Sequence, residues 1–274
     1  MDWRQSAMTE EKIEDAVSAV LHDDGVAVVT RNAPPNNFLD VPTLSLLADK
    51  LEELDRNATC RVTVIRAEGK HFCAGANLAS PRPEVSKDRG AGVGPDIGEL
   101  YREALRIFRL NKPLVAATQG SSIGGGLGLA LACDFRVATP ESRFSANFAL
   151  LGFHQGFGIT ETLPAIVGQQ RAWEMLFTAR RLTGSVAHSI GLCDRLVGAD
   201  ELDERAYEFA LELASAAPRA VEAIRATMRG DIADRVERAL VREAREQGKL
   251  ARTADFKEGI KATAERRPPK FTGS

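Results

Sequence analysis

The sequence contains few of the residues that bind metals or form disulfides. Its 274 residues include four cysteines and four histidines. The cysteines have no CxxC or zinc-ligand spacing and the histidines form no ligand cluster, so we expect reduced thiols, no metal site and a cytoplasmic location. These residues are Cys60, Cys73, Cys133 and Cys193, with His22, His71, His154 and His188.

Long apolar runs and an excess of one charge are also absent. No run approaches the roughly 18 apolar residues of a membrane helix, and residues 1–12 contain no apolar core of a secretory signal. Lysine and arginine total 36 against 38 aspartates and glutamates, for a net charge of −2. This balance argues against nucleic-acid binding. The length suits one large α/β domain with a sizeable core.

Two glycine-containing turns are the most informative segments. HFCAGAN at 71–77 follows an apolar stretch at 61–67, and GSSIGGGLGLA at 120–130 follows another at 113–119. The apolar stretches predict buried strands, and the second turn leads into a small apolar helix. Backbone N–H groups at a helix start are unpaired and carry positive potential. Two such turns are therefore able to direct two N–H groups at one developing oxyanion.

Two other interpretations fit a glycine-rich turn taken by itself. Such turns often serve only close packing of a helix on a strand. A nucleotide site is the second possibility, but the dinucleotide fingerprint requires a third glycine where Leu129 stands, and the Gly-Lys-Ser/Thr of phosphate-binding loops is absent.

The rest of the chain alternates strand and helix patterns. Residues 25–30 predict a strand, and residues 41–54 and 97–110 predict helices, the second capped by Asp96. Residues 79–94 are rich in proline, glycine and charge, and predict either a lid or a plain insertion. Helical, charged segments follow residue 197, so we divide the chain into a core at 1–197 and a helical region at 198–274. The segments are 200–216, 218–228, 231–249 and 254–264.

Several segments occur in the order found in a known family. They are AEGKHFCAGANL at 67–78, KPLVAATQG at 112–120, GGGLGLALACDFRVA at 124–138, ALLGF at 149–153, LPAIVG at 163–168 and GLCDRLV at 191–197. From about residue 26 onward the chain resembles the crotonase (enoyl-CoA hydratase/isomerase) superfamily. The resemblance implies a spiral of strand-strand-helix units with C-terminal helices that form a homotrimer or a dimer of trimers. It also implies an acyl-CoA substrate and no further cofactor.

The resemblance assigns roles to particular residues. The family holds the thioester carbonyl between two backbone N–H groups, which correspond here to Ala76 and Gly125. The positions expected to contact the substrate or its CoA part are Pro35, Asn36, Ala74, Asn77, Leu78, Gly124 and Phe148. Asn77 stands where the family usually has aspartate.

The chain departs from the family at its acid/base positions. Hydratases of this family carry two glutamates, and the corresponding residues here are Gly128 and Phe148. Neither transfers a proton, so the two-glutamate hydration mechanism is unavailable from these positions. His154, in the loop that follows, is the first candidate for a replacement because imidazole titrates near neutral pH. Further candidates are Asp96, Glu99 and Glu161. The aromatic residues Phe144, Phe148, Phe153 and Phe157 predict either core or an apolar acyl pocket.

Three hypotheses about function remain open from the sequence. The leading one is a lyase or isomerase, of the kind used in fatty acid metabolism, that stabilises a thioester enolate with nonstandard acid/base residues. The second is a non-catalytic acyl-CoA-binding protein of the same fold, suggested by the loss of both glutamates. The third is a nucleic-acid-binding relative, whose expected lysine-rich helix is not present.

Overall fold

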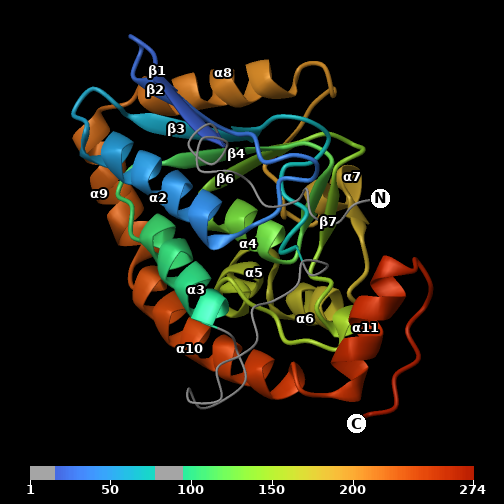
Figure 1. Ribbon diagram of the computed structural model, residues 1–274. Coiled ribbons are helices and arrows are strands. Elements are labelled where there is room, and N and C mark those ends of the chain that lie inside the picture. Colours follow the sequence, from blue (N-terminus) through green and yellow to red (C-terminus); the bar gives the residue numbers. More distant parts are fainter. Residues whose placement is uncertain (1–15, 78–94) are drawn as a thin grey trace.

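The fold is built on a six-stranded sheet with helices on both faces (Figure 1). The computed structural model describes residues 16–77 and 95–274, except for the side chains of residues 95–97; the loop expected at 79–94 lies outside these residues. The first pair of strands is antiparallel and the other pairs are parallel. In spatial order the strands are β1 (Val17–Leu21), β2 (Val26–Arg31), β3 (Val62–Ala67), β4 (Leu114–Thr118), β6 (Phe135–Ala138) and β9 (Arg195–Leu196).

One face of this sheet is covered by helix α8 (Leu202–Ala214). The central strands are apolar runs, as expected for parallel strands buried on both faces. The ring centroid of Phe209 on α8 lies 5.0 Å from that of Phe135 on β6, so the aromatic rings close this side of the core. One register row under α8 consists of Val28, Val64, Val115 and Phe135.

The opposite face carries helices α2 (Val41–Arg56), α3 (Pro95–Phe108) and α4 (Gly125–Ala132). Helix α2 begins after Asp40, whose carboxylate accepts a hydrogen bond from the Thr43 N–H at 2.9 Å. The predicted helices at 41–54 and 97–110 are confirmed. The predicted cap at Asp96 is wrong, because α3 already begins one residue earlier.

A second, three-stranded sheet forms the other half of the core. It consists of β5 (Ser121–Ile123), β7 (Arg143–Ser145) and β8 (Leu182–Thr183). Buried residues from this sheet and the helices around it form a separate hydrophobic cluster. The surrounding elements are the 3₁₀ helix η2 (Ala149–Leu151) and helices α5 (Ile159–Val167), α6 (Gln169–Thr178) and α7 (Gly184–Ser189).

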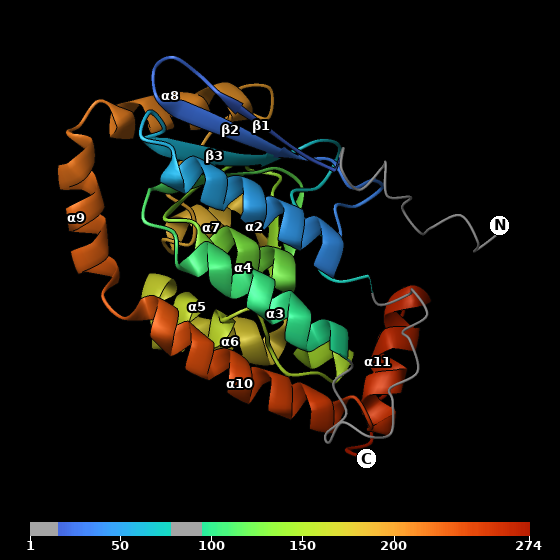
Figure 2. The same cartoon turned by 60° about the vertical axis from the view of Figure 1, so that its left-hand side comes forward.

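The four helices expected after residue 197 are confirmed as α8, α9 (Pro218–Arg229), α10 (Ile232–Leu250) and α11 (Ala254–Ala264). In Figure 2, α9 connects the α8 side of the molecule to α10, which runs along α3 and α5. None of the helices in the described ranges is long and apolar enough to cross a membrane. The division at residue 197 stays a prediction; the helices beyond it pack directly on the elements before it.

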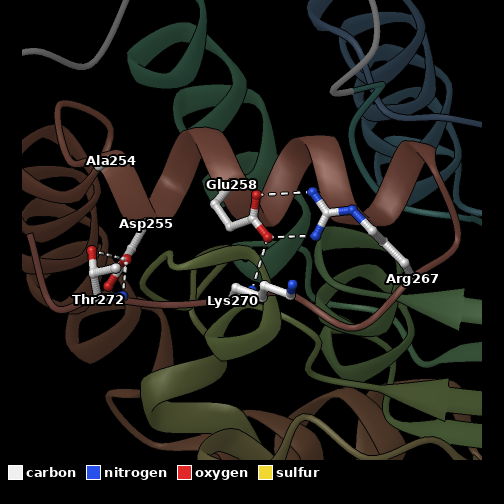
Figure 3. Close-up of a pocket in the computed structure, with 6 residues that line it drawn as sticks. All are labelled: Ala254, Asp255, Glu258, Arg267, Lys270 and Thr272. Carbon is white, nitrogen blue, oxygen red and sulfur yellow. Dashed lines mark hydrogen bonds and ion pairs between the residues drawn. The ribbon is translucent and has the colours of Figure 1, made fainter.

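The last residues of the chain fold back along α11 (Figure 3). The Glu258 carboxylate accepts hydrogen bonds from Arg267 Nη1 at 2.5 Å and Nη2 at 2.9 Å, and from the Lys270 N–H at 2.8 Å. Asp255 accepts from the Thr272 N–H at 2.7 Å. Pairing with Arg267 lowers the pKa of Glu258 to about 2, so the carboxylate stays ionised, and keeps these hydrogen bonds, at acidic as well as neutral pH.

Candidate active site

The first glycine turn is positioned by a buried asparagine. Asn37 Nδ2 donates hydrogen bonds to the carbonyls of Glu68 and His71 at 2.8 and 2.7 Å. The neighbouring Asn36 carbonyl accepts from the Ala74 N–H at 3.1 Å. These bonds join the loop after β2 to the turn after β3, so two segments far apart in the sequence form one wall.

His71 has a structural role in this turn. Its Nδ1 accepts a hydrogen bond from the Ser121 N–H at 3.2 Å. Burial lowers the pKa of His71, which favours the neutral ring that this bond requires. The imidazole therefore helps to align the turn with β5.

The two glycine turns lie side by side. Cys73 N–H donates to the Ser121 carbonyl at 2.9 Å, and Ile123 N–H donates to the Cys73 carbonyl at 3.1 Å. Gly75 has a φ of +89°, and a Cβ there would lie 2.8 Å from the Ile123 oxygen. Only glycine fits such a contact. The same Cβ position is 4.0 Å from the Gly125 nitrogen, so the second turn directly borders the first.

Both turns contain backbone N–H groups that have no hydrogen-bond partner in the described part of the chain. Neither the Ala76 nor the Gly125 amide has a hydrogen-bond partner among the described residues. Gly125 is the first residue of α4, where N–H groups have no intrahelical acceptor and the helix dipole is positive. Two unpaired amides on adjacent turns are the arrangement that stabilises an oxyanion.

Both turns line a cavity of about 120 Å³. Its described lining consists mainly of apolar side chains and glycines, together with three polar side chains. No carboxylate or imidazole is present in that described lining. The polar side chains are Tyr101 from α3, Asn147 from the segment after β7, and Gln247 from α10.

Two of these polar side chains bind each other. Tyr101 Oη donates to Gln247 Oε1 at 2.7 Å, and burial raises the pKa of Tyr101 well above its usual range, so its hydroxyl stays a neutral donor. Gln247 Nε2 donates to the carbonyls of His154 and Gln155 at 3.0 and 3.3 Å. In contrast, the Asn147 side chain has no hydrogen-bond partner in the part of the chain that the structure describes, so it is available to a ligand.

The structure brings half of the ten predicted site residues together around the cavity. Asn77 ends the first turn, and Pro35 and Asn36 belong to the loop that is hydrogen-bonded to it, but none of the three lines the cavity; Leu78 lies outside the described residues. Of the predicted substrate-binding and oxyanion residues, those that line the cavity are Ala74, Ala76, Gly124, Gly125 and Phe148.

The proposed proton-transfer residue does not line the cavity. His154 is half-buried, and its Nδ1 lies 2.9 Å from the Gln155 carbonyl oxygen. Its catalytic role stays a prediction. Of the other candidates, Glu161 lies in the first turn of α5 and faces Arg235 on α10 at 3.8 Å. Among residues 16–77 and 95–274, no three potential metal ligands come together.

A buried carboxylate from α10 holds the loop at 153–160, which contributes to the cavity lining. Glu243 is 0% exposed. Its Oε2 accepts from the Gly158 N–H at 2.9 Å, and its Oε1 accepts from the Thr160 N–H at 3.1 Å and hydroxyl at 2.6 Å. A carboxylate is well suited to this position, because it accepts several bonds and lies at the positive start of α5.

We expect Glu243→Gln to destabilise the protein by about 1–3 kcal/mol, because its NH₂ group would face N–H donors and leave one of them unsatisfied. Chemical denaturation followed by circular dichroism measures this. Glu237 lies on the same helix and forms an exposed ion pair with Arg109, the residue after α3. Glu237→Gln is therefore the matched control and should have little effect. Equal stability of Glu243→Gln and wild type would contradict the assigned role.

Comparison with known proteins places this geometry in a family. The model of the enoyl-CoA hydratase/isomerase family matches residues 22–274. The chain belongs to the enoyl-CoA hydratase/isomerase family. It is an enzyme of this family, and its fold matches those of solved members.

Several relatives of the enoyl-CoA hydratase/isomerase family align over nearly the whole chain. A probable enoyl-CoA hydratase of Bacillus subtilis is 31% identical over 255 residues, covering 92% of this chain and 96% of that protein. The mitochondrial methylglutaconyl-CoA hydratase of Mus musculus is 33% identical over 281 residues, covering 98% of this chain and 88% of that protein. The crystal structure of an enoyl-CoA hydratase/isomerase from Pseudoalteromonas atlantica superposes with a TM-score of 0.83 at 29% identity, covering 94% and 100%.

Proposed function

We propose that this enzyme binds an acyl-CoA thioester with its carbonyl oxygen between the N–H groups of Ala76 and Gly125. The observation that carries the proposal is the pair of unpartnered amides on adjacent turns bordering one mostly apolar cavity. A thioester enolate bears negative charge on that oxygen. The amides therefore stabilise the enolate more than the bound substrate, which is the condition for catalysis.

The names of the relatives support a CoA thioester as the substrate, since they are hydratases of such compounds. In our proposal the CoA part lies along the outer side of the first turn, near Pro35, Asn36, Ala74 and Asn77. The Asn36 carbonyl already holds the Ala74 amide, so these residues form a continuous backbone surface. The proposal needs no cofactor other than the CoA that the substrate carries.

The same proposal includes chemistry without the two hydratase glutamates. Phe148 lines the cavity where one carboxylate would stand, and Gly128 has no side chain. The proton-transfer step is assigned to another group, for which His154 remains the first candidate. Isomerisation, decarboxylation, hydrolysis or hydration through other groups all use the same stabilised enolate or its oxyanion.

We expect crotonyl-CoA hydration to be at least about 10²–10⁴-fold slower than with a two-glutamate hydratase assayed in parallel, because acid/base catalysis contributes on that order. Loss of the enoyl absorbance measures the rate, and calorimetry measures acyl-CoA affinity. A rate similar to that of the reference enzyme would contradict the mechanism. Absence of affinity for any acyl-CoA would contradict the binding proposal itself.

A screen of acyl-CoA thioesters by mass spectrometry separates catalysis from binding without turnover. Conversion of at least one thioester would support catalysis. Binding of many thioesters with conversion of none would favour the alternative, a non-catalytic acyl-CoA-binding protein.

The proposed assembly is a homotrimer or a dimer of trimers. Helices α9 and α10 carry apolar side chains that are largely exposed in the single chain: Ile224 is 62%, Met228 80% and Val241 70% exposed. Burial of such a surface against further copies is favourable. We expect light scattering at micromolar concentration to give three or six times the chain mass of 29.6 kDa. A monomer would contradict this prediction.

A further inference from the structure

Phe157 adopts an unusual backbone conformation inside the cavity wall. Its φ is +61°, a region that bulky residues rarely adopt. The side chain is only 1% exposed and lines the cavity. A strained conformation of this kind persists where the surrounding structure holds it, and such positions concentrate at functional sites.

The Phe157 side chain packs on a glycine face of α4. A Cβ at Gly128 would lie 2.5 Å from Phe157 Cβ and 2.8 Å from its Cγ and Cδ1. A Cβ at Gly125, one turn earlier, would lie 3.7 Å from Phe157 Cδ2. The absence of side chains at these two positions therefore makes room for the phenylalanine, whose ring reaches the residue that donates the second oxyanion N–H.

Other residues fix the ring in this place. Phe108 on α3 lies with its ring centroid 6.4 Å from that of Phe157. The next residue, Gly158, is held by the Glu243 carboxylate. Since both the backbone and the ring are held, Phe157 forms a rigid end wall of the cavity rather than a side chain that moves aside.

The cavity is small for a ligand site. Its volume of about 120 Å³ is below the roughly 300–1,000 Å³ usual for such sites. The rings of Phe157 and Phe148 lie next to Gly125 and Gly124 in the second turn, which is where the first carbons of an acyl group would lie in the proposed binding mode.

We propose that Phe157, accommodated by Gly128, is the residue that determines acyl-group size: it restricts the site to acyl-CoA thioesters with short, unbranched acyl groups. This inference rests on the proposed function. The pocket accepts a few carbons beside the oxyanion turns, and longer or branched chains meet the Phe157 ring. Rejection is steric, because a wall held by Phe108 and Glu243 cannot yield without disturbing α3 and α10.

The test compares acyl-CoA affinities of wild type and Phe157→Gly by calorimetry, using butyryl-, isobutyryl- and octanoyl-CoA. Glycine suits the positive φ and removes the ring. We expect wild type to prefer butyryl-CoA by about tenfold or more over the other two, a ratio typical of steric selection in apolar pockets. In Phe157→Gly the ratio should fall to within about threefold. Phe157→Leu, which shortens the wall and keeps apolar packing, should give an intermediate ratio.

Phe144→Leu is the matched control, because Phe144 is equally buried and does not belong to the described lining. It should keep the wild-type ratio. If Phe157→Gly and Phe157→Leu both keep the wild-type ratio, the inference is overturned while acyl-CoA binding stands. If wild type binds none of the three thioesters, the proposed function fails instead.

The link between Phe157 and Gly128 has a test of its own. Gly128→Ala should lower the thermal midpoint because the new methyl collides with Phe157. Adding Gly128→Ala to Phe157→Gly should lower the thermal midpoint by less than adding it to wild type. Independent, additive effects would overturn the claim that Gly128 accommodates the phenylalanine.

Discussion

Turnover of the thioester substrate should fall by roughly 10²–10³-fold when Gly125 is replaced by proline. Proline deletes the N–H that we place on the developing oxyanion. It is tolerated at the first position of a helix, where that N–H has no intrahelical acceptor. Gly125 is the first residue of α4, and its φ lies outside the positive region reserved for glycine. The loss should therefore reflect the missing donor rather than a broken helix.

Gly125→Ala is the control for the added Cβ. Both variants introduce a Cβ that meets Leu39 Cδ1 at 2.9 Å, the flexible end of a side chain, but only alanine keeps the N–H. Steady-state kinetics should show the alanine variant much closer to wild type than the proline variant. Similar activity of both variants, at any level, would remove Gly125 N–H from the oxyanion hole.

The free energy of unfolding should fall by about 3–5 kcal/mol in Asp134→Ala, as expected when a buried charge loses its partner. The Asp134 carboxylate accepts from Arg225 Nε at 2.9 Å, Arg229 Nη1 at 2.8 Å and the Leu114 N–H at 2.9 Å. Burial lowers the pKa of Arg225, which reflects the cost of keeping this charge out of water. Without Asp134 the guanidinium would remain buried with no carboxylate.

Denaturant unfolding measures the loss, and thermal midpoints should fall by about 2–4 °C per kcal/mol in a protein of this size. Asp203→Ala is the control. Asp203 pairs with Arg66 at 3.0 Å, but its side chain is 56% exposed, so the change should cost less than about 1 kcal/mol. If the two variants proved equally stable, the pairing of Asp134 with Arg225 and Arg229 of α9 would not provide the expected stability.

The elements with strong local signals were predictable from the sequence. Helix α2 combines a capping aspartate with apolar residues at helical spacing, and the two glycine turns follow apolar strands. Strand β1 has no such signal, because it is a short, half-exposed edge strand that depends on pairing with β2. The start of α3 was misplaced because an aspartate suits either a cap or the first turn of a helix.

The site was predictable where it is made of local backbone and unpredictable where distant side chains meet. The amides of Ala76 and Gly125 belong to turns that the sequence itself marks. Tyr101 and Gln247 are 146 positions apart and form a hydrogen bond only in the folded chain. The match between Gly128 and Phe157 is also a contact between separate elements. The sequence has a glycine at 128, but no local pattern indicates that Phe157 packs against it.

The hydrogen bonds that join α10 to the loop at 153–160 have a consequence for protein engineering. Residues 153–160 accept hydrogen bonds from Gln247 and donate hydrogen bonds to Glu243. The loop and α10 therefore form one structural unit. A chimera that takes the first 197 residues from one homologue and the remaining helices from another would combine the loop of one protein with the α10 of the other. If Phe157 determines acyl-group size as we propose, transplanting that preference requires moving the loop together with α10.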